Sequence, residues 1–455
     1  MSHARTVRRL YTLLWYLALP FVLLSGLRRA RREQAAGIAV GPEGARSLWR
    51  ERLALDEADD VGNDAGGLLW IHAASVGEVQ LAAELIGALR AREPPQPIEL
   101  SCNTATGRAR AQALLPQVRV RYAPYDLPAA LARRLSALQP RALVLMETEL
   151  WPNLLHAASC AGIPTLIASA RLSERSLRGY RRLESLFRPA LRQCLWVGAQ
   201  TAADAARFVE LGVPAERVTV AGNLKFDRTI PAETRARGRQ LRALLSVARP
   251  VWVAGSTHPA EQPVLLEAHR QLLARQPQAL LVLAPRHPPR FEEAAAQLAK
   301  QGWRFQRRSS QTHGEALAAD CQVLLLDTLG ELLDFYAAGD VAFVGGSLAP
   351  VGGHNLLEPA ALGLPVLAGA HQSNSPEIAR ALLEAGALDI VADAGQLATR
   401  LQVLLASEAQ RRTQAERASA ALESHRGALE RLLTLIDALP PPGRVNSSGA
   451  LPRLQ

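Results

Sequence analysis

Short runs of apolar residues alternate with longer amphipathic stretches along most of the chain from Leu68 onward. Such runs are typical of strands buried on both faces of a parallel sheet, and the stretches between them have the apolar spacing of covering helices. The predicted strands form two series. The first comprises Leu68–His72, Ile98–Cys102, Val118–Tyr122, Leu143–Met146, Thr165–Ser169, Leu195–Ala199 and Val218–Val220, and the second comprises Val251–Ala254, Leu280–Ala284, Val323–Leu326, Val341–Val344 and Pro365–Ala368.

Two such series predict an α/β protein with two doubly wound, Rossmann-like domains that face one cleft. The length of 455 residues agrees, since domains average ~150 residues. We expect the first domain over residues 33–227, an Arg- and Ala-rich helical bridge over 228–248 and the second domain over 249–438. The remaining segment, 439–455, is rich in Pro, Gly and Ser, which predicts a disordered tail.

The segment before these domains is strongly apolar. Residues 10–27 carry no charge, and residues 1–32 contain seven Arg and no acid. A helix over residues 10–27 would be ~27 Å long, close to the ~30 Å of a hydrocarbon core. Arg clusters on both sides disfavour a buried core helix, and Arg28–Arg32 stand where a signal peptide would have small residues. We therefore predict a membrane anchor over residues 1–32, either spanning the bilayer or lying in its interface, with the following domains in the cytoplasm.

The net charge of +10 adds little to this picture. Subtracting the seven Arg of residues 1–32 leaves +3 for the other 423 residues, so the body gives little support to nucleic-acid binding. The cysteines Cys102, Cys160, Cys194 and Cys321 are scattered without a CxxC pair, which indicates a reducing compartment and excludes a zinc ribbon or a disulfide framework.

Ligands of open α/β sheets lie beyond the carboxyl ends of the strands, so the loops there are the candidate sites. Glu78 closes a strand-to-helix turn, where a carboxylate is either a helix cap or a general base for a substrate hydroxyl, and the helix dipole would favour its ionised form. Glu147 and Glu149 follow another strand and indicate contacts to a sugar-like substrate or helix caps, since further metal ligands are not near. Lys225 is one of two Lys against 50 Arg, which suggests a site that needs a compact charge. Seven Arg within residues 171–192 indicate either a solvated helix or a surface for anionic lipid or a phosphorylated acceptor.

The second series has its own polar loops. The longest glycine-rich segment runs from Gly345-Gly346-Ser347, after a buried strand, to Gly352-Gly353-His354-Asn355, which is predicted to open a helix. Glycines let a backbone approach a ligand, and free amides at a helix N-terminus bind phosphate. Glu358, one turn later, could accept ribose hydroxyls. The spacing matches neither GxGxxG nor GxxxxGK[ST], which argues against NAD(P) enzymes and P-loop ATPases.

Eight motifs, in this order, resemble the 3-deoxy-D-manno-octulosonic acid (Kdo) transferases of lipopolysaccharide assembly. They are SVGE (75–78), TATG (104–107), TELWPN (148–153), GNLKFD (222–227), GSTH (255–258), PRH (285–287), DTLGEL (327–332) and GGSLAPVGGHNLLEP (345–359). The resemblance covers roughly residues 5–430.

The resemblance implies a GT-B glycosyltransferase that moves Kdo from CMP-Kdo to a lipid A precursor, lipid IVA, at the cytoplasmic face of the inner membrane. It implies that Glu78 is the general base, that Glu149 is a second carboxylate of the cleft, and that Lys225 lies near the Kdo of the donor. It implies no metal or other cofactor, and its partners would be CMP-Kdo, the lipid A precursor and inner-membrane lipid. The implied donor-binding residues are Ser256, His258, Arg286, His287, Gly330, Glu331, Ser347, Gly353, Asn355, Glu358 and Asn374.

The chain departs from the family pattern around the donor. Glu261 is followed by Gln262 where the family has an acidic pair, and His371 and Asn374 stand where an aromatic residue is usual. Two alternatives to Kdo transfer remain at this point. One is a UDP-sugar-dependent GT-B transferase or epimerase, and the other is a non-catalytic, membrane-anchored binding protein.

Overall fold

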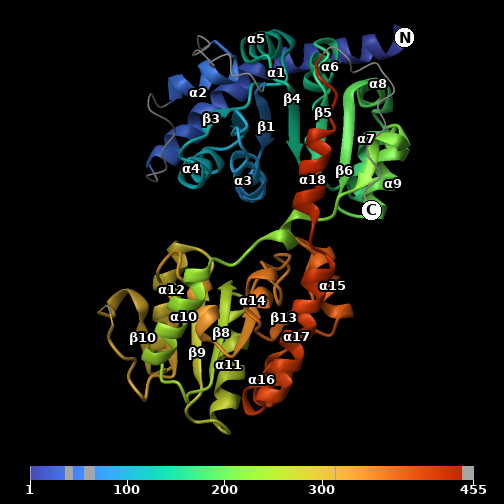
Figure 1. Cartoon of the computed structure of the whole chain (residues 1–455). Helices are drawn as coiled ribbons and strands as arrows, with labels where there is room; N and C mark the ends of the chain where they lie inside the picture. The colour runs from blue at the N-terminus through green and yellow to red at the C-terminus, as the bar shows by residue number, and fades with distance from the viewer. Residues whose placement is uncertain (1, 36–44, 56–66, 313, 443–455) are drawn as a thin grey trace. The chain divides into compact units, whose positions relative to one another are not determined.

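The computed structural model describes residues 2–35, 45–55, 67–312 and 314–442. The chain forms two compact units, Met1–Asp227 with Arg426–Gln455, and Arg228–His425 (Figure 1). The segment 443–455, most of the predicted tail, lies outside the described residues, as does the acidic stretch 56–66.

The first unit is built on a parallel sheet of order β3-β2-β1-β4-β5-β6-β7. The strands are parallel throughout, and the order in which they are added to the sheet reverses between β1 and β4, the point at which open sheets bind ligands. Its strands are β1 Leu69–Ala73, β2 Ile98–Cys102, β3 Arg119–Tyr122, β4 Ala142–Met146, β5 Thr165–Ala170, β6 Leu195–Ala199 and β7 Val218–Val220. Its helices are α1 Ser2–Ala35, α2 Ala45–Arg52, α3 Val76–Arg90, α4 Ala105–Leu114, α5 Pro128–Leu138, α6 Pro152–Cys160, α7 Glu174–Arg181, α8 Glu184–Cys194, α9 Ala202–Leu211 and α18 Ala428–Asp437.

The second unit has a parallel sheet of order β10-β11-β9-β8-β12-β13-β14, with the corresponding reversal between β8 and β12. Its strands are β8 Val251–Thr257, β9 Leu280–Pro285, β10 Phe305–Arg307, β11 Val323–Leu325, β12 Val341–Val344, β13 Val366–Ala368 and β14 Leu388–Ile390. Its helices are α10 Ala232–Leu244, α11 Gln262–Leu273, α12 Phe291–Lys300, α13 Leu332–Ala338, α14 Leu357–Leu362, α15 Pro376–Glu384, α16 Ala394–Ala406 and α17 Glu408–Ser424.

Every strand expected from the sequence is present, and the two Rossmann-like sheets are confirmed. Two edge strands, β10 and β14, were not expected. Each has three residues, and neither is fully buried, so neither produces the apolar run that marks a central strand.

The boundaries of the units differ from the expected ones at the C-terminus. Helix α18 returns to the first unit, where Leu432, Leu435 and Ile436 join the core beneath the first sheet (Figure 1). Carboxylate oxygens of Asp227 accept the Gly427 and Leu429 amides at 2.6 Å each and fix the start of this helix. The second unit therefore ends near His425 rather than at residue 438. The expected bridge is α10, which packs against α13 within the second unit.

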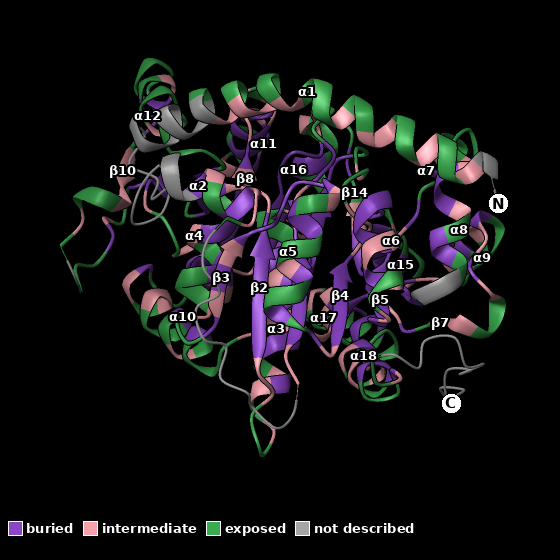
Figure 2. Ribbon diagram, turned by 90° about the horizontal axis from the view of Figure 1, so that it is seen from above, coloured by how far each residue is buried: buried purple, intermediate pink, exposed green. Residues whose placement is uncertain are grey.

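Helix α1 is a single long helix that packs on the first unit against α2, α6 and α8. None of the residues in its apolar window, Ala4–Gly26, is fully buried (Figure 2). By length and composition, this helix is a candidate membrane anchor.

Candidate active site

Glu78 lies just beyond the carboxyl end of β1, in the first turn of α3. Ser75 caps this helix, and its hydroxyl group accepts the Glu78 amide at 3.4 Å while donating to the Glu78 carboxylate at 2.9 Å. The Ala74 amide donates to the other carboxylate oxygen at 2.8 Å. Glu78 is therefore a capping carboxylate. Each of its oxygens retains a further lone pair for a substrate hydroxyl, so the cap and the base are compatible.

The pKa of Glu78 is raised above its ordinary value, chiefly because the half-buried carboxylate loses hydration. The charges of Glu149 and Glu147 raise the pKa further, while the donors at Ala74 and Ser75 oppose the shift. The sequence argument expected the helix dipole to favour the ionised form, but burial is the larger influence here. A higher pKa makes the carboxylate a stronger proton acceptor once it is ionised.

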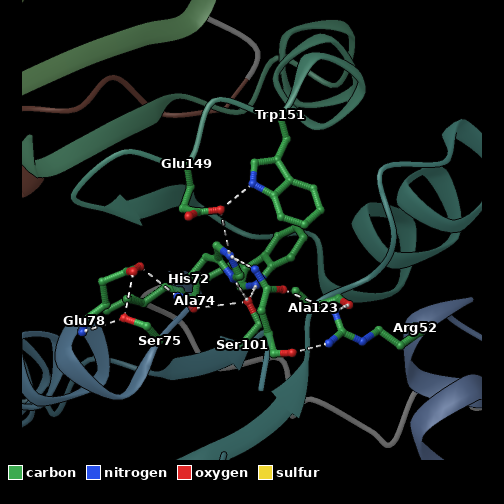
Figure 3. Close-up of polar contacts among 12 residues, drawn as sticks. Arg52, His72, Ala74, Ser75, Glu78, Ser101, Ala123, Glu149 and Trp151 are labelled. Carbon is green, nitrogen blue, oxygen red and sulfur yellow. Dashed lines mark hydrogen bonds and ion pairs between the residues drawn. The ribbon is translucent and has the colours of Figure 1, made fainter. Parts of the chain in front are cut away.

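Glu149 follows β4, directly across the sheet reversal from β1 (Figure 3). Its carboxylate accepts the indole N–H of Trp151 and lies 3.8 Å from Nε2 of His72. The Nδ1 atom of buried His72 is 2.9 Å from the hydroxyl oxygen of Ser101, which fixes the ring orientation. The sequence analysis missed His72. Its signal is a polar side chain in an otherwise apolar strand, two residues after the buried Trp70.

Lys225 lies on a short 3-10 helix, Leu224–Asp227, of the same unit. Its Nζ atom is 3.3 Å from a carboxylate oxygen of Glu147. Both partners are partly exposed, so a ligand carboxylate could exchange with Glu147 for this ammonium group.

In the second unit, the carboxylate of Glu261 organises the loop after β8. It is fully buried and accepts four backbone amides, from His258 at 3.0 Å, Gly346 at 2.7 Å, and Ser347 and Leu348 at 2.9 Å each. The sequence analysis expected free, phosphate-binding amides where Gly352-Gly353-His354-Asn355 was predicted to open a helix, but the Gly353 and His354 amides donate to the Gly346 and Gly345 carbonyls at 2.7 Å and 3.1 Å. An internal carboxylate already occupies the anion-binding loop.

Ser347 belongs to the same scaffold. Its hydroxyl donates to the Val344 carbonyl at 2.6 Å and accepts the Gly369 amide at 2.8 Å, and the side chain is fully buried. Helix α14 starts at Leu357, later than the expected start after Gly353.

A cluster of histidines lies beside Arg286 at the carboxyl ends of β8, β9 and β12. The rings of His258 and His354 stack with centroids 5.2 Å apart and Nε2 atoms 2.9 Å apart, and His287 meets His258 edge-on at 5.7 Å. Burial and the nearby Arg286 charge lower the pKa of His354 to about 4 and lower that of His287. His354 is thus neutral at pH 7. Arg286 is exposed, and no ion pair is recorded for it within the described residues.

The other predicted donor-binding residues each have local partners of their own. Glu331 accepts hydrogen bonds from Arg308, the closest at 2.7 Å, and from the Thr328 hydroxyl. Gly330, which precedes Glu331, has a φ of 89°. Glu358 pairs with Arg228 at 3.4 Å.

Three further predicted residues shape the loops. The side-chain oxygen of Asn355 accepts the Leu357 amide at 3.0 Å, and the Asn374 side chain donates to the Gly353 carbonyl at 2.9 Å. Ser256 lies within β8 with a φ of 55°, where the register of β8 against β9 shifts between Ala254 and Thr257. In the described part of the chain, no group of three or more His, Cys, Asp or Glu is placed to hold a metal ion.

Comparison with known proteins agrees with this architecture. Residues 47–228 match a family model described as 3-deoxy-D-manno-octulosonic-acid transferase. The chain is 40% identical over 370 residues to the 3-deoxy-D-manno-octulosonic acid transferase of Haemophilus influenzae, covering 81% of this chain and 86% of that protein. It is 41% identical over 378 residues to that of Bordetella pertussis, with the same coverage.

Among solved structures, UDP-GlcNAc 2-epimerase from Neisseria meningitidis covers 80% of this chain and 99% of its own, with a TM-score of 0.54 and 16% identity. At this identity the likeness concerns the fold alone, which is the two-domain arrangement of Rossmann-like sheets.

Proposed function

Because the chain belongs to the Kdo transferase family of glycosyltransferases, we propose that it moves Kdo from CMP-Kdo to lipid IVA, a lipid A precursor. The observation that carries the proposal is Glu78. This carboxylate lies at the sheet reversal of the first unit, has a raised pKa and keeps free lone pairs toward a ligand.

In the proposed reaction, ionised Glu78 accepts the proton of an acceptor hydroxyl group. The hydroxyl oxygen then forms a bond to the anomeric carbon of Kdo as the bond from that carbon to the CMP phosphate oxygen breaks. CMP leaves with the bonding electron pair, and attack from the opposite side inverts the anomeric centre. A positioned base of this kind contributes about 10²–10⁴-fold in rate.

The first unit supplies the acceptor side in this proposal. Glu149 keeps the local potential negative and so maintains the raised pKa of Glu78. Lys225 would exchange its ion pair with Glu147 for the carboxylate of Kdo, which is the donor group of matching charge.

The second unit supplies the donor side. Arg286 would pair with the CMP phosphate, because its guanidinium is exposed and offers a planar set of donors. His258, His287 and the neutral His354 would add hydrogen bonds, and Glu358 would accept the ribose hydroxyls. The remaining predicted residues, Ser256, Gly330, Glu331, Ser347, Gly353, Asn355 and Asn374, would act by holding the loops around the nucleotide.

We place the protein at the cytoplasmic face of the inner membrane, with α1 as its anchor. The support is the apolar window Ala4–Gly26, which is long enough for a membrane helix. An acceptor carrying acyl chains would also be presented at a membrane surface.

The test is transfer of radiolabelled Kdo to purified lipid IVA by the full-length protein. CMP-Kdo is generated immediately before use, and EDTA is added before the transfer step. We expect a labelled lipid product, and its gel mobility counts the sugars added. Calorimetry with CMP and UDP is the companion measurement, with CMP expected to bind more tightly. Absence of product together with tighter UDP binding would overturn the proposed donor.

A further inference from the structure

We propose that α1 does not cross the bilayer but lies flat in its interface, with one face on the first unit and the opposite face in lipid. The inference concerns how the chain meets the membrane and does not depend on which sugar is transferred. It rests on the contacts, exposure and charge of the helix and of the surface beneath it.

One face of α1 is packed on the protein. Val7, Tyr11, Trp15, Leu19 and Val22 recur at intervals of four and three residues, the spacing of one helix face. The first two pack against the core that contains α6 and α8, and the others pack on a small apolar cluster that leads into α5. This face is a protein interface along most of the apolar window.

Polar contacts fasten the same face. The Tyr11 hydroxyl donates to a carboxylate oxygen of Asp126 at 2.9 Å, and the Trp15 indole N–H donates to the Tyr11 hydroxyl at 2.7 Å. The Thr12 hydroxyl lies 3.2 Å from the side-chain oxygen of Asn153. Asp126 in turn accepts the backbone amides of Asn153 and Leu154 at 3.1 Å and 2.7 Å, so the contact is built into the start of α6.

The opposite face of α1 is apolar and uncovered. Its side chains are spaced three and four residues apart, and two of them, Leu17 and Phe21, are 63% and 76% exposed. A helix that is apolar on both faces needs a second apolar environment besides the protein. The exposed apolar side chains of this face are Leu10, Leu13, Leu14, Leu17, Phe21 and Leu24. In the ribbon of Figure 2, α1 is coloured as exposed or intermediate along its described length.

A spanning orientation is incompatible with the packed face. Tyr11 and Thr12 lie well inside the window Ala4–Gly26, so in a spanning helix their depth would be within the hydrocarbon region. Their partners Asp126 and Asn153 would then lie at that depth too, together with the loop and helix that carry them. Burying a folded, charged domain in hydrocarbon costs far more than one apolar helix gains. With α1 in the plane of the interface, these contacts stay within the protein and the apolar stripe of α1 reaches the acyl chains.

The charge around α1 indicates an anionic bilayer. A groove of about 660 Å³ lies beside the N-terminal half of the helix, and its arginine lining residues are Arg5, Arg8, Arg188 and Arg192. Glu184 is the acidic residue of this lining and pairs with Arg188. Beyond the apolar stripe, Arg28 is exposed at the other end. Arg residues at both ends of an apolar helix are the pattern of interfacial helices on anionic lipid.

The first experiment determines on which side of the membrane the N-terminus lies. The full-length protein carries a cleavable peptide tag before Ser2 and is reconstituted into sealed vesicles containing anionic phosphatidylglycerol. Protease added outside the vesicles digests the two units only of those molecules whose units face outward. In these molecules we expect the tag to be cleaved as well. A tag that is cleaved only after detergent is added would show a spanning helix and would overturn the proposal.

The second experiment measures depth along the helix. Spin labels are attached to single cysteines at Leu10, Leu17 and Leu24 in a background where Cys160 and Cys194 are serine. An interfacial helix places all three labels at the same depth by power saturation. A steady change of depth from Leu10 to Leu24 would contradict the proposal.

The third experiment tests the exposed face itself. The double variant Leu17→Glu with Phe21→Glu should reduce binding to anionic vesicles about tenfold or more, since it removes apolar insertion and adds charge that anionic lipid repels. The matched control is Val209→Glu with Val220→Glu, which changes two side chains of the first unit outside α1 that are 40% and 44% exposed. Equal binding by both double variants would show that lipid does not cover this face.

Discussion

Two glutamates occupy equivalent places in the two sheets and have opposite surroundings. Glu78 follows β1 and Glu261 follows β8, the strand that borders the reversal point in each sheet. Across the reversal, β4 leads to the carboxylate of Glu149, whereas β12 leads to three backbone amides that bind Glu261. Glu78 stays half-buried with an elevated pKa and open lone pairs. Glu261 is fully buried and its acceptors are occupied.

The comparison shows that the fold places a glutamate at the same position in both sheets. The loop after the facing strand determines whether the carboxylate of that glutamate is available to a ligand. A carboxylate beside a second carboxylate is held ready to accept a proton, whereas one wrapped by amides is a structural element of the loop. Burial also shifts titration in each site. It raises the pKa of Glu78 and lowers that of His354 to about 4, in both cases toward the neutral form.

The largest expected difference between substitutions of the two glutamates is in the rate of Kdo transfer. Glu78→Gln keeps an acceptor for the Ala74 amide but removes the proposed base, so we expect transfer to fall by about 10²–10⁴-fold. CMP affinity and the melting temperature should not fall. The control is Glu84→Gln, on the same helix α3 and outside the described contacts of Glu78, which should keep full activity. A Glu78→Gln variant with normal turnover would show that the base lies elsewhere.

The equivalent substitution of the second glutamate is expected to lower the stability of the second unit. In Glu261→Gln, one side-chain oxygen can serve only part of the four amides, and the new NH₂ group faces the rest. Leaving two buried amides unpaired costs about 1–3 kcal/mol each, which for a unit of this size lowers the melting temperature by roughly 4–24 °C. Calorimetry is the measurement, with exposed Glu293→Gln as the control. If melting is unchanged, Glu261 is not the organiser of the loop.

Local sequence patterns were sufficient to predict much of the fold. The central strands were predictable because each is a short apolar run, and Glu78 was predictable because its cap lies within SVGE. The role of Glu261 was not predictable, since three of its four amide partners lie 85 to 87 residues away in sequence. The carbonyl partners of the Gly353 and His354 amides, Gly346 and Gly345, lie seven and nine residues away in sequence, so these amides were expected to be free. The return of α18 to the first unit is likewise a long-range contact, made through an apolar face that would suit either core.

The proposed role of Arg286 in the second unit can be tested by measuring the affinity for CMP. Arg286→Ala removes the proposed charge-assisted contact to the CMP phosphate. Such a contact is worth about 1.5–3 kcal/mol, so we expect a loss of about tenfold to a hundredfold in affinity. Arg290→Ala changes an exposed arginine four residues later that is paired with Glu293, and it should bind CMP normally. Calorimetric titration measures both. Normal CMP affinity in Arg286→Ala would remove Arg286 from the donor site.

The smallest expected effect is a displacement of the pH profile, and it tests why the two glutamates differ. The acidic limb of kcat/KM follows deprotonation of the base in the free enzyme, so a raised pKa places that limb above the range of an ordinary glutamate. Of the two neighbouring carboxylates, Glu149 has the larger effect on the pKa of Glu78. Glu149→Gln removes this charge and keeps an acceptor for the Trp151 indole, so the pKa of Glu78 falls and the acidic limb moves to lower pH. Glu147→Gln should move it in the same direction by less, and Glu84→Gln should leave it unchanged. A limb that stays fixed or moves upward in Glu149→Gln would show that the facing carboxylate does not set the basicity of Glu78.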